Sequence, residues 1–244
     1  MNEDLNNLQY WPIRDYRYAQ HFQNIHFQDK NLTQTERQLL VRIIDETIAD
    51  FSSGFTLVDS ILEDEKDKHD RYHEIDRTVV SVMLFVLITA VDSLVTSKYF
   101  IQTSNDYDKR FFRGKLMVIL NEGFKKLYGF NDKNRHNSEW VRLSPLLKDF
   151  PDIINKQYIE LTELLEKHAQ SSSWWNDERN LETHIIAEGL YQSRQEEVVE
   201  SRVMESSMKL FDTLLAVDRF LTNMHACLVN SLIAMYKRGE LKEE

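Results

Sequence analysis

The sequence predicts an all-α fold, a helical bundle with an N-terminal aromatic arm, and three observations favour it. The 244 residues include only six glycines and three prolines, so few residues interrupt regular structure. No Asn-Gly, Asp-Gly or Gly-Gly pair is present, although tight β-hairpins depend on such pairs. Apolar residues recur every three or four positions over long stretches, which is the period of an amphipathic helix.

The first helix is expected to begin just after Thr33, because Thr33 and Glu36 have the spacing of a capping box. Its apolar stripe consists of Leu40, Ile44, Ile48 and Phe51. Gly54 follows this stripe and is expected to end the helix, since glycine is common just after a helix C-terminus.

Further helices are expected along the rest of the chain, with few breaks between them. Their approximate ranges are 55–70, 74–101, 107–128, 139–149 and 179–200. Another helix begins at Pro151-Asp152, and the longest apolar stripe predicts a last helix over 211–235. We expect Gly129 to end the helix over 107–128. The expected loops are 102–106, 130–138 and 170–176.

A single helical-bundle domain is expected over residues 33–244. No loop in this range is long enough, or rich enough in Gly, Pro or Ser, to link two domains. Residues 1–32 form an arm before it, which carries the aromatic residues Tyr10, Trp11, Tyr16, Tyr18, Phe22 and Phe27. We expect this arm to pack on the protein's own core, with packing on a partner as the alternative.

Composition is typical of a globular protein from a reducing compartment, so we expect a cytoplasmic location. Cys227 is the only cysteine, which excludes an internal disulfide, and its apolar neighbours predict a buried thiol. Residues 1–30 lack the apolar run of a signal peptide. The longest apolar run, 79–91, is shorter than the roughly 20 residues that cross a bilayer, so no membrane association is expected.

Charge is distributed unevenly along the chain. The formal net charge is −10, which argues against a protein that coats nucleic acid non-specifically. From residue 109 to residue 142, however, nine cations face three acids, a local formal excess of six positive charges. Such a stretch is either a solvated helix face or a local anion-binding surface.

One motif predicts a specific function, the hexapeptide Arg179-Asn180-Leu181-Glu182-Thr183-His184. It resembles the signature of the HEPN superfamily, in which an arginine, usually followed by a polar residue, precedes a histidine in a compact helical domain. That family includes metal-independent endoribonucleases, many of them toxins or antiviral effectors, and inactive members that bind or dimerise. The resemblance implies that Arg179 holds the scissile phosphate, that His184 is the acid–base group and that Asn180 is the polar residue after the arginine.

These residue types suit RNA cleavage without a metal or another cofactor. A histidine that titrates near neutrality moves the 2′-hydroxyl proton, and a permanently charged arginine stabilises the phosphorane oxygens. Five residues turn through about 500° of helix, so Arg179 and His184 would lie about 140° apart on a single helix. Either the helix begins between them, or the site is assembled across a homodimer, as is usual in the family. Asn180 shares a helix face with His184 and would orient its ring.

Other arginine–histidine pairs have a similar spacing, namely Arg14/His21 and Arg219/His225. The copy at Arg179 is preferred because a polar residue follows its arginine and because it lies where a loop meets a helix. In contrast, Phe220 follows Arg219 within a predicted core helix, which indicates a structural role for that pair.

Two further features are expected to support the site. Trp174 and Trp175 precede the motif, and a tryptophan pair beside a loop indicates a shaped cleft. Asp92 interrupts an apolar helix, and a buried carboxylate needs a partner. That partner is expected to be Arg110 or Arg113 from the next helix, or the motif itself. A purely structural ion pair is the alternative.

A competing pattern is Glu65-x3-His69-x3-His73, which places metal-ligand side chains at four-residue steps on one helix face. These residues lie in the strongly acidic stretch over 59–76, and no other helix offers a matching histidine-rich motif. We therefore expect a solvated surface row without a bound metal.

Three hypotheses follow from the sequence. The first is a HEPN-like protein that cleaves or binds RNA at Arg179, Asn180 and His184. The second is a non-catalytic helical module for dimerisation or interaction with a partner. The third is a metal-dependent helical-bundle enzyme, which would use the row over 65–73.

Overall fold

A computed structural model of the chain describes residues 32–172, 175 and 200–238. Within these residues every regular element is helical and no strand is present. The predicted all-α bundle is therefore confirmed. The aromatic arm lies outside the described residues except for Leu32, so its packing stays a prediction.

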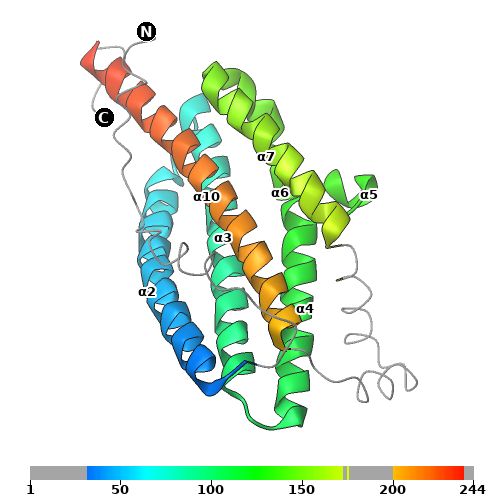
Figure 1. Cartoon of the computed structure of the whole chain (residues 1–244). Helices are drawn as coiled ribbons and strands as arrows, with labels where there is room; N and C mark the ends of the chain where they lie inside the picture. The colour runs from blue at the N-terminus through cyan, green and yellow to red at the C-terminus, as the bar shows by residue number, and fades with distance from the viewer. Residues whose placement is uncertain (1–31, 173–174, 176–199, 239–244) are drawn as a thin grey trace.

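Five long helices form the bundle (Figure 1): α2 (Gln34–Glu65), α3 (Arg71–Gln102), α4 (Asp106–Leu127), α7 (Asp152–Ser171) and α10 (Glu200–Lys237). Between α4 and α7 the chain forms the short helices α5 (Asp132–Arg135) and α6 (Glu139–Leu143) and the 3-10 helix η2 (Ser144–Asp149). The helix α3 packs against α2, α4 and α10, and α7 packs on the outer side of α10. The core thus lies around α3 and α10.

The predicted start of the first helix and the predicted stop at Gly129 are both confirmed. The Thr33 hydroxyl accepts a hydrogen bond from the Glu36 backbone N–H, and the Glu36 carboxylate accepts one from the Thr33 N–H at 2.7 Å. Gly129 follows α4 with a φ of 88°, a left-handed conformation that favours glycine. Its N–H donates to the Phe124 carbonyl at 3.1 Å, which satisfies one of the last carbonyls of the helix.

The predicted break at Gly54 is wrong, because α2 continues through this residue to Glu65. Gly54 is buried, and the apolar stripe of α2 continues from Phe51 to Val58 on the side that faces the core. A glycine inside a helix costs about 1 kcal/mol, which the packing of the following turns outweighs. The chain breaks instead at residues 66–70, where charged and polar side chains offer no apolar face.

The helices α3 and α4 lie antiparallel in a fixed register. Three contacts set this register, Phe85 with Lys126, Thr89 with Gly123 and Tyr99 with Phe112. At Gly123 an added Cβ would lie 2.5 Å from the Thr89 Cγ2 atom, so the close approach of the two helices requires glycine there.

One helix, α3, is long and apolar enough to cross a membrane, by length and composition only. Of its most apolar 18-residue window, 56% is buried within the bundle. The core helix of a soluble protein passes the same test, so this finding is weak support for a membrane span. The helix extends well beyond the apolar run over 79–91 that the sequence draws attention to.

Candidate functional site

Most of the HEPN-like motif lies where the structure gives no description. Arg179, Asn180, His184 and Trp174 are all outside the described residues. The structure does describe Trp175 and Glu200, which border the range 176–199 that contains the motif. The geometry around the motif is therefore built from these two ends.

At the first end, Trp175 belongs to the core and is only 1% exposed. Its ring meets the edge of the His168 ring at a centroid distance of 5.1 Å. On its other side His168 stacks on Phe124 of α4 at 4.3 Å, and its Nδ1 atom lies 2.7 Å from the Thr213 hydroxyl of α10. We expected a tryptophan pair that shapes a cleft, but Trp175 buries its ring and does not present it to solvent.

His168 is uncharged at neutral pH in this environment. Burial, followed by the nearby charge of Lys209, lowers the pKa of His168 to about 3. The buried polar atoms around this end are incompletely paired: within the described residues, His168 Nε2, the Ser172 hydroxyl and the Asn121 amide have no hydrogen-bond partner. The first end of the range is thus a neutral cluster held mainly by ring packing.

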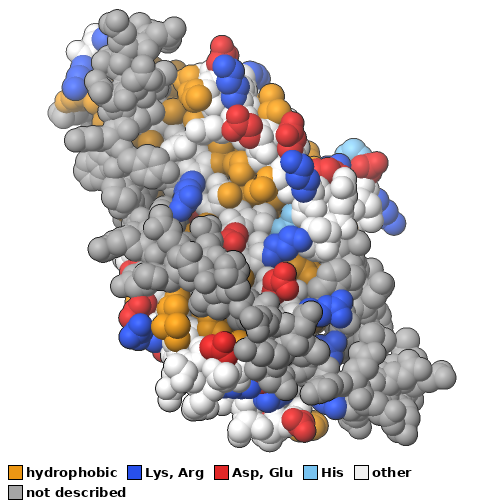
Figure 2. Space-filling view, viewed as in Figure 1, with side chains coloured by type: hydrophobic (Ala, Val, Ile, Leu, Met, Phe, Trp, Pro, Cys, Tyr) orange, Lys and Arg blue, Asp and Glu red, His pale blue; other side chains and the backbone are white. Residues whose placement is uncertain are grey.

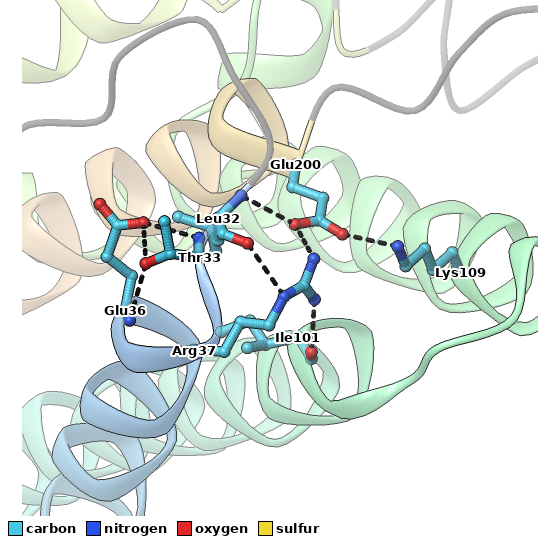
Figure 3. Close-up of polar contacts among 7 residues, drawn as sticks. All are labelled: Leu32, Thr33, Glu36, Arg37, Ile101, Lys109 and Glu200. Carbon is cyan, nitrogen blue, oxygen red and sulfur yellow. Dashed lines mark hydrogen bonds and ion pairs between the residues drawn. The ribbon is translucent and has the colours of Figure 1, made fainter.

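At the second end, the Glu200 carboxylate holds together three other parts of the bundle (Figure 3). Arg37 of α2 forms an ion pair with it, and Lys109 of α4 approaches at 2.8 Å. The Leu32 backbone N–H donates to the same carboxylate at 3.1 Å. The Arg37 guanidinium also donates to the Ile101 carbonyl of α3 at 2.8 Å, so the ends of four helices meet at this point.

Glu200 is charged although its side chain is almost completely buried. Burial alone would raise the pKa of this carboxyl, but the hydrogen bonds and charges of Arg37 and Lys109 outweigh burial and hold the pKa below its ordinary value. We call Glu200, Arg37 and Lys109 the Glu200 clasp. The clasp fixes the first residue of α10 against α2 and α4.

The two ends lie beside the same two helices. Ser171, the last residue of α7, contacts Lys209 of α10. Lys209 is nine residues after Glu200, which corresponds to about 14 Å along α10. The helix α4 contacts both ends, since Lys109 reaches the Glu200 clasp and Phe124 packs on His168. Both His168 and Glu200, which lie on either side of the range 176–199 in the sequence, therefore contact α4.

The expected burial of Asp92 is wrong, and the structure does not pair it with Arg110 or Arg113; the third expected partner, the motif, lies outside the described residues. Asp92 is exposed, and among the described residues it has no hydrogen-bond or ion-pair partner. The register of α3 and α4 places Asp92 beside about residue 120 of α4. Arg113 is roughly 10 Å from that point along the axis of α4, and Arg110 is further away. Partial desolvation raises the pKa of Asp92 above its ordinary value. Arg110 and Arg113 are partly buried on α4 and have other partners.

Most of the positive stretch over 109–142 is neutralised within the fold. Five of its nine cations form ion pairs with acids: Lys109, Lys125, Lys126, Arg135 and Arg142. Of the others, Lys115 is exposed and contacts the Phe111 ring, without a carboxylate partner among the described residues. The stretch is therefore mainly a set of structural ion pairs.

The second motif copy and the row over 65–73 have structural explanations. His225 Nδ1 lies 2.7 Å from the Asp76 carboxylate of α3, which ties α10 to the start of α3. The expected single helix face for Glu65, His69 and His73 is wrong, because α2 ends at Glu65 and α3 begins at Arg71. Within the residues that the structure describes, no group of three or more metal-ligand side chains is close enough to hold an ion.

Comparisons with protein-family models, with curated proteins and with solved structures find no match to this chain. The resemblance to the HEPN superfamily therefore rests on the hexapeptide at Arg179–His184 and on the all-helical fold.

The Glu200 clasp and His168 were not among the residues singled out in the sequence. Glu200 is one of several acids before α10, and nothing in its local pattern distinguishes it from a surface acid. His168 does carry a signal, because it continues the apolar stripe Ile154, Tyr158, Leu161 and Leu165 at the next three-residue step. A polar residue in register with such a stripe indicates a buried group.

Proposed function

We propose that the chain is a HEPN-like protein that binds RNA and cleaves it without a metal, with Arg179, Asn180 and His184 as its site. The observation that carries this proposal is the spacing of the motif in a chain whose described residues fold as a helical bundle. The resemblance also suggests a toxin or defence role and a homodimer, and both stay predictions.

In the proposed reaction, the 2′-oxygen of one nucleotide attacks the adjacent phosphorus and the bond to the 5′-oxygen breaks. His184 serves in the transfer of the proton from the 2′-hydroxyl, and the 5′-oxygen receives a proton as it leaves. Arg179 stabilises the negative charge that gathers on the phosphorus oxygens. The products are a 2′,3′-cyclic phosphate and a 5′-hydroxyl end.

Two features of the described residues support a functional segment at 176–199. Trp175, four residues before Arg179, and Glu200, sixteen residues after His184, are both buried in the bundle, so the chain is anchored before and after the motif. In addition, α4 contacts Glu200 through Lys109 and His168 through Phe124.

The alternative is a non-catalytic interaction module, and one observation favours it. Figure 2 shows hydrophobic side chains on the surface over α7 and α10, among charges of both signs. The exposed apolar residues of these helices are Ile153, Ile159, Leu164, Val229, Ile233 and Tyr236. Exposed apolar patches are common at protein interfaces.

An RNA cleavage assay in EDTA separates the two functions. His184→Ala removes the acid–base group and should lower the rate roughly 10²- to 10⁴-fold. Arg179→Ala removes the cation and should cost roughly 10²- to 10³-fold. Arg219→Ala is the matched control from the second motif copy and should leave cleavage unchanged. All three variants should melt near the wild-type temperature, because partly exposed polar residues contribute little to stability.

The outcomes decide between the proposals. EDTA-resistant cleavage that both motif variants abolish, and that the control keeps, supports the enzyme. A wild-type protein that cleaves none of a varied set of RNAs, or a His184→Ala variant that mainly unfolds, favours the interaction module instead.

A further inference from the structure

We propose that the C-terminal end of α3 and the N-terminal end of α4 form a stacking surface for single-stranded RNA. This inference rests on the proposed function and specifies how the RNA would be held. The stacking surface is defined by Tyr99, Tyr107, Phe111, Phe112 and Lys115.

Exposed aromatic rings are concentrated at this place. Among the described residues four large aromatic side chains are highly exposed, and three of them lie here: Tyr99 (51%), Tyr107 (74%) and Phe111 (52%). The fourth, Tyr236, lies at the other end of the bundle, near the C-terminus of α10. An exposed aromatic ring gives up part of the free energy of burial, so three together indicate a binding surface.

Two of the three exposed rings, Tyr99 and Phe111, pack on Phe112, which is partly buried. Tyr99 stacks on Phe112 with a centroid distance of 5.5 Å and an interplanar angle of 16°. Phe111 meets Phe112 edge to face at 5.3 Å. Tyr107, Phe111 and Lys115 follow at four-residue steps and share one face of α4, about 6 Å apart along the axis. Ring positions fixed in this way reduce the ordering cost of binding.

Positive charge accompanies the rings. The Lys115 Nζ atom lies 5.5 Å from the centre of the Phe111 ring, and Lys115 has no carboxylate partner among the described residues. Arg110 and Arg113 lie on the same turns of α4. Two acids, Asp106 and Asp108, begin this helix, and the Asp108 carboxylate accepts a hydrogen bond from the Asn105 side chain. Lys115 lies one turn beyond Phe111, on the helix face that carries the exposed rings.

Single-stranded RNA fits this chemistry better than a protein partner. Bases in a single strand offer flat faces to Tyr107 and Phe111, while the phosphates between them are close enough for Lys115 to neutralise. An apolar protein surface would cover the same rings only by removing Lys115 from water without a counter-charge, which is costly. Duplex RNA keeps its bases stacked inside and cannot reach the rings. The surface should therefore prefer single strands.

Fluorescence anisotropy with the full-length protein tests this proposal. The probes are a labelled oligouridine, a mixed-sequence single strand and the same mixed sequence as a duplex. Tyr107→Ala and Phe111→Ala should each raise the Kd for the single strands about tenfold, and the double variant more. Lys115→Ala should weaken binding and reduce its dependence on salt. Tyr236→Ala, a ring of equal exposure to Tyr99, is the control and should change nothing.

The readouts also separate this inference from the proposed cleavage. Unchanged single-strand affinity in the Tyr107/Phe111 double variant, or equal affinity for the duplex, overturns the stacking surface. A double variant that alters the oligomeric state in sedimentation, with RNA affinity unchanged, identifies a protein interface instead. If the ring variants lose RNA binding while the wild type cleaves nothing, the stacking surface stands and the proposed catalysis fails.

Discussion

Glu200 and His168 are two buried ionisable side chains with opposite charge states. Glu200 keeps its charge because Arg37 and Lys109 surround its carboxylate. His168 gives up its charge, since its ring lies between aromatic side chains with no acid beside it. A buried charge is tolerated only when it is paired, whereas a buried base can simply remain neutral.

Glu200 and the residues around His168 therefore stabilise the bundle in different ways. The Glu200 clasp joins residues of four helices through directional contacts, so it holds this turn of α10 against α2, α3 and α4. The His168 cluster fills space between α4, α7 and α10, and some of its polar atoms have no partner among the described residues. Removal of the charge on Glu200 should therefore destabilise the fold, and so should protonation of His168.

The largest effect is expected for Glu200→Gln. This substitution keeps the shape of the side chain but leaves Arg37 and Lys109 beside a neutral amide in a buried place. Removal of one partner from a buried ion pair costs about 3–5 kcal/mol. The free energy of unfolding from denaturant titration at neutral pH should fall by this amount. Glu205→Gln, an exposed acid on the same helix, should change it by less than about 0.5 kcal/mol.

The acid dependence of the same variant sharpens this test. Because the folded protein lowers the pKa of Glu200, its charge adds stability above the ordinary pKa of 4.5, and this stability disappears as the pH falls through the lowered value. The difference between wild type and Glu200→Gln should therefore be constant near neutrality and shrink only below about pH 4.5. A constant difference down to strongly acidic pH would show that Glu200 acts through packing and not through charge.

An effect of comparable size, which develops only as the pH falls, is expected for His168. Its pKa falls from 6.5 in the unfolded chain to about 3 in the folded protein, so between these values the unfolded chain binds more protons. As the pH falls through this window, His168 alone should lower the free energy of unfolding of the wild type by about 1.4 kcal/mol per pH unit. His168→Gln, which can still bond to Thr213, should lack this component.

Denaturant titrations from about pH 7 to about pH 4 give the free energy of unfolding of both proteins. The contribution of His168 is the difference between the slopes of this free energy against pH. The difference should begin below pH 6.5, well before the Glu200 effect sets in. Parallel curves for wild type and His168→Gln would mean that the folded protein protonates His168 at an ordinary pKa and that the ring is not truly desolvated.

The sequence predicts the local elements of this fold well and its long-range polar contacts poorly. The capping box at Thr33 and the stop at Gly129 depend on neighbouring residues, so the local pattern suffices to identify them. The continuation of α2 through Gly54 depends on packing against α3, which no local pattern contains. The Glu200 clasp joins Glu200 to Lys109 and Arg37, which are 91 and 163 positions away in the sequence, and only the folded topology brings them together.

The error at Asp92 has a more specific cause. The apolar run of α3 suggests burial on all sides, but Ile88, Asp92 and Tyr99 recur at steps of four and seven residues and share one exposed face. Asp92, the polar residue within the apolar stretch of α3, thus indicates the exposed face of this helix. A carboxylate inside an apolar stretch can therefore indicate the solvent side of a core helix as well as a buried site.

The smallest effect is expected at Asp92. In contrast to Glu200 and His168, its side chain is exposed, and it has no partner among the described residues. Partial desolvation raises its pKa, so ionisation slightly opposes folding once the pH rises through that value. Asp92→Asn should therefore stabilise the protein at neutral pH and have no effect in acid. Because solvent screens this exposed group, the gain should stay below about 0.5 kcal/mol in the same titrations. A loss of about 2 kcal/mol instead would mean that Asp92 has a partner outside the described residues. A fall in RNA cleavage together with that loss would assign the partner to the proposed site.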